Sequence, residues 1–256
     1  MSITSKIKTF FWFLARPSYY GQLLSLIRST IWRNPGEDTR KESEAWCESQ
    51  AIDNSTFLKE HLGINEIDVS QLFQDIFIKA HNMADAAPVK MGGPGNINLI
   101  YTLCEYLKAE KVIETGVAYG WSTLALLLSL QKRTQSLLIS IDLPYAKMSN
   151  EDYVGCVIPA NLKSNWELVR QPDRKALPKA LSEVQPLDMC HYDSDKTYAG
   201  RMWAYPKIWE KIRKGGFFIS DDIGDNIAFR EFCKKNSLVP IVIKLNNQFV
   251  GVLQKP

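Results

Sequence analysis

The sequence predicts an α/β fold: a doubly wound, mostly parallel seven-stranded sheet with an antiparallel last strand, preceded by N-terminal helices. From residue 111 onward, short apolar runs alternate with segments of helical periodicity. Parallel neighbouring strands need such crossover helices between them. Only Asn246 and Asn247 separate the last two apolar runs, and so short a turn joins antiparallel strands.

Each strand of the expected sheet is a short apolar run that ends in a turn or in polar residues. The expected strands are 111–115, 136–142, 166–169, 186–193, 217–222, 239–245 and 248–254. Helical spacing fills the connections at 122–130, 174–184 and 202–212, and Gly215-Gly216 is expected to end the last of these helices.

Residues 145–165 are too long for a routine connection in this pattern, so we expect a lid or a wall of a binding site there. Tyr145 and Tyr153 in this insertion, with Trp166 and Trp203, are candidates to stack on a bound acceptor. Buried core positions are the alternative for all four aromatic side chains.

The N-terminal third reads differently from the rest, and we expect a helical extension over residues 1–85 and the main domain over 86–256. Apolar residues recur at helical spacing in 72–80 and 99–107, whereas 33–44 is polar and carries Pro and Gly, which predicts a loop. The apolar run 10–15 is too short to span a bilayer. Three alternatives are open for this basic, aromatic segment. We expect it to pack on its own domain, to pack on a second subunit of a homo-oligomer, or to make peripheral contact with a membrane surface.

Composition excludes several classes of function. The 256 residues are 45% hydrophobic and 23% charged, which is globular, and the net charge of +3 comes without a dense basic stripe, which argues against nucleic acid as a partner. The five cysteines are odd in number and have no metal-finger spacing. Reduced thiols in a cytoplasmic protein are therefore the expectation.

A glycine turn follows the first strand of the expected sheet. In "ETGVAYGWS" the glycines are Gly116 and Gly120, whereas Ala118 and Trp121 occupy the positions where a dinucleotide fingerprint has its other two glycines. A tryptophan there excludes a dehydrogenase and predicts a ligand without a pyrophosphate. Asp142 ends the next strand, where a carboxylate accepts hydrogen bonds from ribose hydroxyls.

Carboxylates follow two further strands. Asp193 ends one of them, and Asp221 and Asp222 end the next. Because neighbouring parallel strands end at the same edge of a sheet, we expect these groups to converge. Three carboxylates suit a hard divalent ion such as Mg²⁺.

This combination of strand ends resembles the cofactor site of class I S-adenosylmethionine-dependent methyltransferases, whose Rossmann-like fold also has an antiparallel last strand. The resemblance covers about residues 88 to 256. It implies that the methionine part of S-adenosylmethionine lies among Gly93, Glu114, Gly116, Ala118 and Ser122, with Asp142 at the ribose and Asp173 at the adenine.

Within this class the chain resembles the metal-dependent O-methyltransferases: distantly the catechol type, and more closely the macrocin-type branch that acts on antibiotic sugars. The resemblance implies that Asp193, Asp221 and Asp222 hold Mg²⁺ and that the acceptor is a hydroxyl of a sugar, glycan or glycosylated small molecule. It offers Asp195 as the preferred base. Lys196, which matches the catechol type, and His191 remain alternatives.

Two other functions stay open at this point. Asp193-Ser194-Asp195 is a D-x-D sequence, which a metal-dependent glycosyltransferase uses under a nucleotide sugar. A non-catalytic scaffold with the same fold is the other alternative. The glycine turn and Asp142 favour the methyltransferase over the glycosyltransferase.

Overall fold

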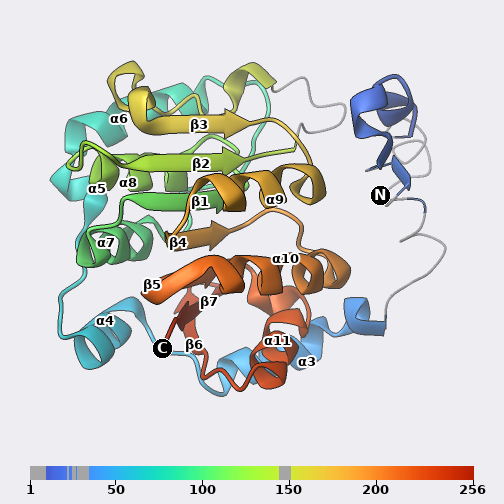
Figure 1. Ribbon diagram of the computed structural model, residues 1–256. Helices are drawn as coiled ribbons and strands as arrows, with labels where there is room; N and C mark the ends of the chain where they lie inside the picture. Colours follow the sequence, from blue (N-terminus) through green and yellow to red (C-terminus); the bar gives the residue numbers. More distant parts are fainter. Residues whose placement is uncertain (1–9, 22, 25–26, 28–34, 144–150) are drawn as a thin grey trace.

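A computed structural model describes residues 10–21, 23–24, 27, 35–143 and 151–256. Its centre is a seven-stranded sheet of order β3-β2-β1-β4-β5-β7-β6 (Figure 1). Strands β1 to β5 are parallel, and β7 runs antiparallel to both β5 and β6. The strands are β1 (Lys111–Thr115), β2 (Leu137–Ile141), β3 (Trp166–Val169), β4 (Leu187–Tyr192), β5 (Ile212–Ser220), β6 (Ile241–Leu245) and β7 (Gln248–Gln254). The predicted fold class is confirmed.

Helices cover both faces of this sheet and lie in the order expected of a doubly wound fold. Those preceding β1 are α3 (Arg40–Glu48), α4 (Asn54–Leu62), α5 (Val69–Leu72), α6 (Gln74–Asp85) and α7 (Ile97–Leu107). The later helices are α8 (Trp121–Leu130), α9 (Asp173–Glu183), α10 (Tyr198–Lys211) and α11 (Ala228–Lys235). Figure 1 shows α9 and α10 on the near face and α7 and α8 behind the strands.

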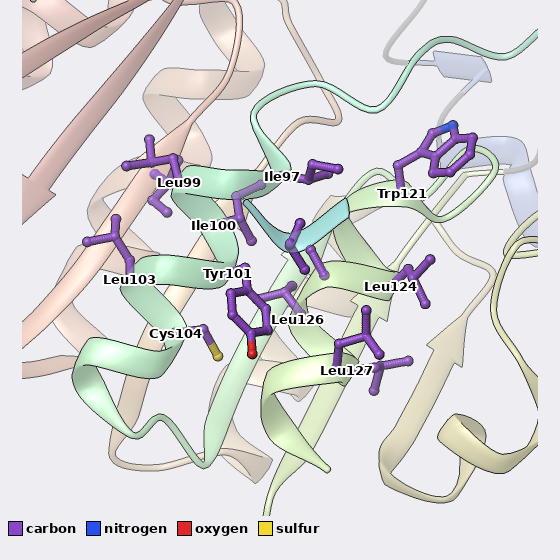
Figure 2. Close-up of a cluster of buried hydrophobic side chains, with 14 of the residues drawn as sticks. Ile97, Leu99, Ile100, Tyr101, Leu103, Cys104, Trp121, Leu124, Leu126 and Leu127 are labelled. Carbon is purple, nitrogen blue, oxygen red and sulfur yellow. The ribbon is translucent and has the colours of Figure 1, made fainter. Parts of the chain in front are cut away.

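The two faces bury separate apolar clusters because successive side chains of a strand point to opposite sides. Val112 of β1 lies in the cluster with α7 and α8, whereas its neighbour Ile113 lies in the cluster with α9 and α10. Figure 2 shows the first cluster, in which Tyr101 and Cys104 of α7 lie on the side of Leu126 and Leu127 of α8. Most residues of both helices are buried, which fixes the chain segments on either side of β1.

The helices before residue 85 pack directly on the sheet. Phe57 and Leu58 of α4 are fully buried and belong to the same apolar cluster as α7 and α8. Ile52, just before α4, makes a parallel bridge to Ile243 of β6, so the polypeptide before α4 extends the sheet edge. Residues 52–58 and the sheet thus share one core. The domain boundary between residues 85 and 86 stays a prediction.

The predicted loop over 33–44 is wrong in its second half, where α3 begins at Arg40. Ser43 is buried and its hydroxyl donates to the carbonyls of Ile223 and Asn226. Arg40 and Glu44 also pair one turn apart on the exposed side of the helix. Tertiary contacts with the chain after β5 make this polar stretch helical.

The predicted end of the helix before β5 is also wrong. The helix ends at Lys211, and Ile212 already belongs to β5, with Gly215 and Gly216 inside the strand. Gly215 has φ +77°, and the pairing with β4 shifts register between Leu187 and Met189. A side chain on Gly216 would collide with the carbonyl of Asp188, at 2.5 Å from its Cβ. The two glycines thus form an irregularity in the strand.

At the N-terminus, residues 10–14 are helical and lie near the carboxyl ends of the parallel strands (Figure 1). Phe13 and Leu23 are buried, and the hydroxyl of Tyr19 donates to the carbonyl of Arg170 at 3.2 Å. No helix in the described ranges is both long and apolar enough to cross a bilayer.

Replacement of Phe57 by alanine tests whether the N-terminal helices fold as part of the sheet. Because Phe57 is fully buried, we expect Phe57→Ala to lower the free energy of unfolding by about 3–5 kcal/mol in a single urea transition. Leu72→Ala, at a side chain 56% exposed, is the control and should cost less than about 0.5 kcal/mol. A separate early transition in Phe57→Ala would contradict the shared core.

Candidate active site

A cavity of about 420 Å³ lies beyond the carboxyl ends of β1, β4 and β5. The strand order reverses between β1 and β4, and doubly wound sheets bind their ligands at that point. The size is within the range usual for small-molecule sites. Its lining comprises Met91, Gly92, Gly93, Pro94, Gly95, Asn96, Ile100, Gly116, Val117, Ala118, Trp121, Ser122, His191, Asp193, Ser194, Lys196, Asp221, Asp222 and Gln248.

The turn after β1 forms one wall of the cavity. Gly116 has φ +84° and Ala118 has φ +50°, so the backbone takes the left-handed conformation twice in three residues. A Cβ on Gly116 would lie 2.3 Å from the carbonyl oxygen of Asp193, which forces glycine where β1 and β4 end side by side. Ser122 follows in the first turn of α8. Gly93, Gly116, Ala118 and Ser122, predicted as cofactor contacts, all line the cavity.

Glu114 lies beneath this turn and is fully buried. Its two carboxylate oxygens accept hydrogen bonds from the hydroxyls of Ser122, Thr123 and Ser140, at 2.6 to 2.7 Å. These bonds join β1 to the start of α8 and to β2. Glu114 is not among the residues that line the cavity, so the geometry gives it the role of fixing the turn from below.

Asp142, predicted to contact ribose, supports the same turn from the side. Its Oδ1 accepts the backbone N–H of Val117 at 3.1 Å, and its Oδ2 pairs with the guanidinium of Arg170. Burial raises the pKa of Asp142, against the opposing effects of Val117 and Arg170. Asp142 lies next to the cavity lining without belonging to it.

Asp173, predicted near the adenine, begins α9 and turns toward β4 instead. The hydroxyl of Ser194 is hydrogen-bonded both to Asp173 Oδ2 and to Thr115 Oγ1. Burial raises the pKa of Asp173 to about 6, although the Ser194 hydrogen bond opposes the shift. Asp173 thus ties α9 to the ends of β1 and β4.

Asp193, Asp221 and Asp222 converge at the floor of the cavity, as the sequence predicts. The cation among them is Lys196, whose ammonium lies 2.9 Å from Asp193 Oδ1 and also pairs with Asp222. A second cation, the fully buried Arg201 of α10, donates to the carbonyls of Asp221 and Asp222. Burial and the Asp221 charge raise the pKa of Asp193 to about 6 despite the nearby Lys196 and His191.

His191 lies between two carboxylates and is buried. Its Nδ1 is 3.6 Å from Glu114 Oε1 and its Nε2 is 3.4 Å from Asp221 Oδ2. Burial lowers the pKa of His191, but the charges of Asp221 and Glu114 outweigh it and raise the pKa to about 10. The imidazole is therefore positively charged. It lies between Glu114, which supports the glycine turn, and Asp221 on the acidic floor.

The three candidate bases occupy different positions. Asp195 accepts from the backbone N–H and the hydroxyl of Thr197 at the start of α10 and does not line the cavity. His191 and Lys196 do line it. Burial lowers the pKa of Lys196, but Asp193 and Asp222 outweigh this and raise it above its ordinary value. Lys196 is therefore an ammonium in this arrangement.

The acidic floor fits a divalent ion in part. Oδ1 of Asp221 is buried and has no hydrogen-bond partner, which fits a hard cation that retains water ligands. Oδ1 of Asp193 is paired with the Lys196 ammonium at 2.9 Å, so a cation there would have to displace that ammonium. Asp222 is instead engaged by Lys196 and by the amide of Gln248. Among the described residues, no group of three or more Asp, Glu, His or Cys side chains is arranged to hold a metal.

Sequence reasoning missed several residues of this site. Trp121 lines the cavity with its buried indole N–H unpartnered, stacked on Phe77; Figure 2 shows it at the start of α8. Its place in the glycine turn was the available signal. Arg170 and Arg201 gave none, because their partners are distant in sequence.

Three aromatic residues predicted as acceptor contacts lie elsewhere. Trp166 donates to Ser140 at 2.9 Å and packs against the core, and Trp203 of α10 lies under the cations of Arg174 and Lys207. Neither these tryptophans nor Tyr153 line the cavity. Tyr145 lies outside the described residues.

Comparison with known proteins gives a family match over part of the chain. Residues 113–223 match the profile of a methyltransferase domain. No curated protein sequence matches the chain significantly. The fold is similar to an O-methyltransferase from Bacillus cereus in complex with S-adenosylhomocysteine, with a TM-score of 0.53, 17% identity, and coverage of 82% of this chain and 100% of that one.

Two further solved structures have similar folds. An O-methyltransferase from Streptomyces achromogenes involved in tomaymycin synthesis, in complex with S-adenosylmethionine, has a TM-score of 0.51 and 16% identity over 84% of this chain and 99% of that one. An S-adenosylhomocysteine-bound methyltransferase from Podospora anserina has a TM-score of 0.54 and 12% identity over 86% and 97%. At these identities the likeness is one of fold.

Replacement of Asp173 tests the electrostatics of the site. Its pKa of about 6 exceeds the ordinary 3.8, so the stability it contributes when protonated is lost as the pH rises through about 6. The asparagine in Asp173→Asn does not ionise. In urea unfolding, the stability of Asp173→Asn relative to the wild type should rise by about 1 kcal/mol between pH 5 and pH 8. A difference independent of pH would contradict the raised pKa.

Proposed function

We propose, for a chain that carries a class I S-adenosylmethionine-dependent methyltransferase domain, that the enzyme is an O-methyltransferase and methylates a hydroxyl of a sugar, glycan or glycosylated small molecule with the assistance of a divalent cation. The observation that carries this proposal is the cavity itself, which is lined both by the glycine turn at Gly116 and by Asp193, Asp221 and Lys196. The turn suits a sulfonium nucleoside, and the polar side chains suit an oxygen acceptor.

S-adenosylmethionine would bind along the turn. Gly93, Gly116, Ala118 and Ser122 offer backbone and a small polar side chain to its methionine part, and Trp121 offers an unpartnered indole N–H. Asp142 already accepts Val117 N–H through one oxygen, so its contribution to ribose binding requires its other oxygen to separate from Arg170. The methyl group then points toward the acidic floor, where near-attack contact with the acceptor oxygen lowers the barrier.

Asp193 and Asp221 are the residues that would hold the divalent cation. Oδ1 of Asp221 has no partner, and Oδ1 of Asp193 would exchange the Lys196 ammonium for the cation. A cation bound there would lower the pKa of the acceptor hydroxyl, as it does for bound water. Asp222 would keep its bonds to Lys196 and Gln248 and thereby hold the ammonium beside the acceptor.

We infer that Lys196 takes the proton from the acceptor hydroxyl, because Lys196 lines the cavity, whereas Asp195 does not and accepts the backbone N–H of Thr197 before α10. His191, enclosed by Glu114 and Asp221, positions Asp221. Lys196 accepts a proton only after losing its own. Since Asp193 and Asp222 raise its pKa, the reaction should accelerate as the pH rises.

The acceptor class is supported by a second hollow that shares Lys196 with the cavity. This groove of about 700 Å³ is lined by Asp38, Arg40, Lys41, Lys196, Thr197, Asp225 and Asn226. All of these side chains carry hydrogen-bonding groups and none is aromatic. Such a lining suits a polyhydroxylated acceptor better than a planar aromatic one.

The glycosyltransferase alternative is disfavoured by Asp195, which is bonded to Thr197 and does not converge with Asp193 on the cavity. Calorimetry separates the two proposals: a nucleotide sugar should not bind, and S-adenosylmethionine should. A scaffold without activity would tolerate loss of Asp193, Asp221 and Asp222 together in the cell.

Asp221→Asn separates the metal site from the cofactor site. Loss of one of the two carboxylates proposed to hold the cation should weaken Mg²⁺ binding by at least about tenfold. S-adenosylmethionine should still bind, because its proposed contacts are Gly116, Ala118 and Ser122 and do not include Asp221. Isothermal calorimetry with each ligand measures both. Asp152→Asn, at an exposed carboxylate, is the matched control. Loss of S-adenosylmethionine binding in Asp221→Asn would place the acid pair in another site.

The pH profile tests the role of Lys196. Lys196→Gln should lower kcat by about 10²–10⁴-fold with little change in S-adenosylmethionine affinity. Asp222→Asn removes a charge that raises the pKa of Lys196, so the rise of kcat with pH should move to lower pH. An unshifted profile in Asp222→Asn would rule out Lys196 as the base.

A further inference from the structure

Exposed apolar side chains concentrate at the N-terminus. Of the eleven large hydrophobic side chains that are exposed in the described ranges, six lie between residues 10 and 27. Among these six, Leu24 and Phe11 are the most exposed, at 67% and 60%. The six, which we call the N-terminal apolar surface, are Phe10, Phe11, Leu14, Tyr20, Leu24 and Ile27. Contiguous exposed apolar surface of this kind marks an interaction site.

The six residues follow helical spacing. Phe10, Phe11 and Leu14 lie on one side of the helix over 10–14, and Tyr20, Leu24 and Ile27 recur at intervals of four and three where the described residues are also helical. Phe13 and Leu23 are buried, and the ring of Phe13 packs against Trp12 and Tyr19 of the same segment. Tyr19 adds its hydrogen bond to Arg170.

The same stretch of sequence has a charge of one sign. Residues 1–36 contain five basic side chains, Lys6, Lys8, Arg16, Arg28 and Arg33, and no Asp or Glu. The whole chain has 31 basic and 28 acidic residues, so the remaining 220 residues carry slightly more acid than base. The excess basic charge of the protein therefore lies in the same stretch of sequence as the N-terminal apolar surface.

We propose that the N-terminal apolar surface binds to an anionic lipid bilayer, with its aromatic and aliphatic side chains in the headgroup region and the basic residues paired with lipid phosphates. Basic, aromatic segments bind in this way because apolar burial and attraction to anionic lipid add together. The surface lies near the carboxyl ends of the parallel strands (Figure 1), so the bound bilayer would face the edge that carries the cavity.

A second copy of the chain fits this surface less well than a bilayer does. Two such surfaces in contact would bring ten basic groups together with no acidic group of the same segments between them, and like charges repel. Anionic headgroups supply the missing negative charge. The buried area needed for a stable dimer would have to come from elsewhere.

Vesicle sedimentation of the full chain tests the proposal. Vesicles of phosphatidylcholine with about one-quarter phosphatidylglycerol should retain the protein, more so at low salt, whereas pure phosphatidylcholine should retain much less. The double variant Phe11→Ser, Leu24→Ser should bind anionic vesicles at least about tenfold more weakly. S-adenosylmethionine binding by calorimetry should be unchanged in this variant, which shows that the domain is folded.

The control replaces equally exposed residues elsewhere: Leu72→Ser with Val239→Ser, at 56% and 88% exposure, should bind vesicles like the wild type. Absence of binding to anionic vesicles at low salt overturns the proposal, as does equal binding by the Phe11, Leu24 variant. Light scattering gives the third outcome that would overturn it, a dimer that dissociates in this variant, since a second copy would then cover the surface. None of these outcomes bears on methyl transfer.

Discussion

The arrangement of the site depends on cationic side chains that lie beside three carboxylates at one edge of the sheet. Asp193, Asp221 and Asp222 converge because β4 and β5 end side by side, and Lys196 and the buried Arg201 compensate the charge that this convergence creates. The compensation is incomplete, since Oδ1 of the Asp221 carboxylate stays unpartnered. Buried polar atoms without partners are costly, and proteins retain them mainly where a ligand completes the bonding.

The cofactor wall is fixed by a layer of carboxylates that do not themselves face the cavity. Glu114 fastens the turn to α8 and β2 through three hydroxyls, Asp142 holds it through Val117, and Asp173 ties α9 to the strand ends through Ser194. The surface that faces a ligand is thus mostly backbone and glycine. The carboxylates lie behind this surface and hold in place a turn in which two residues have the left-handed backbone conformation.

The sequence alone predicted the sheet and the convergence of the acids, because strand periodicity and residues at strand ends are local signals. It missed α3, which is helical through contacts made 180 residues away in sequence by Ser43. It also misplaced the start of β5, where a strand irregularity at Gly215 and Gly216 resembles a helix stop. In the site, Asp195 matched a motif position but is engaged by its own helix start, and the roles of Arg170 and Arg201 depended on tertiary pairing that no local pattern records.

Arg170 joins two parts of the molecule that are otherwise remote. Its guanidinium pairs with Asp142 beside the glycine turn, and its backbone carbonyl accepts the hydroxyl of Tyr19 from the N-terminal segment. A nucleoside that competes for Asp142 would weaken the hold on Arg170, and the hydrogen bond from Tyr19 to Arg170 would respond to the change. By thermodynamic reciprocity, whatever docks on that segment would in turn alter how tightly the nucleoside is held.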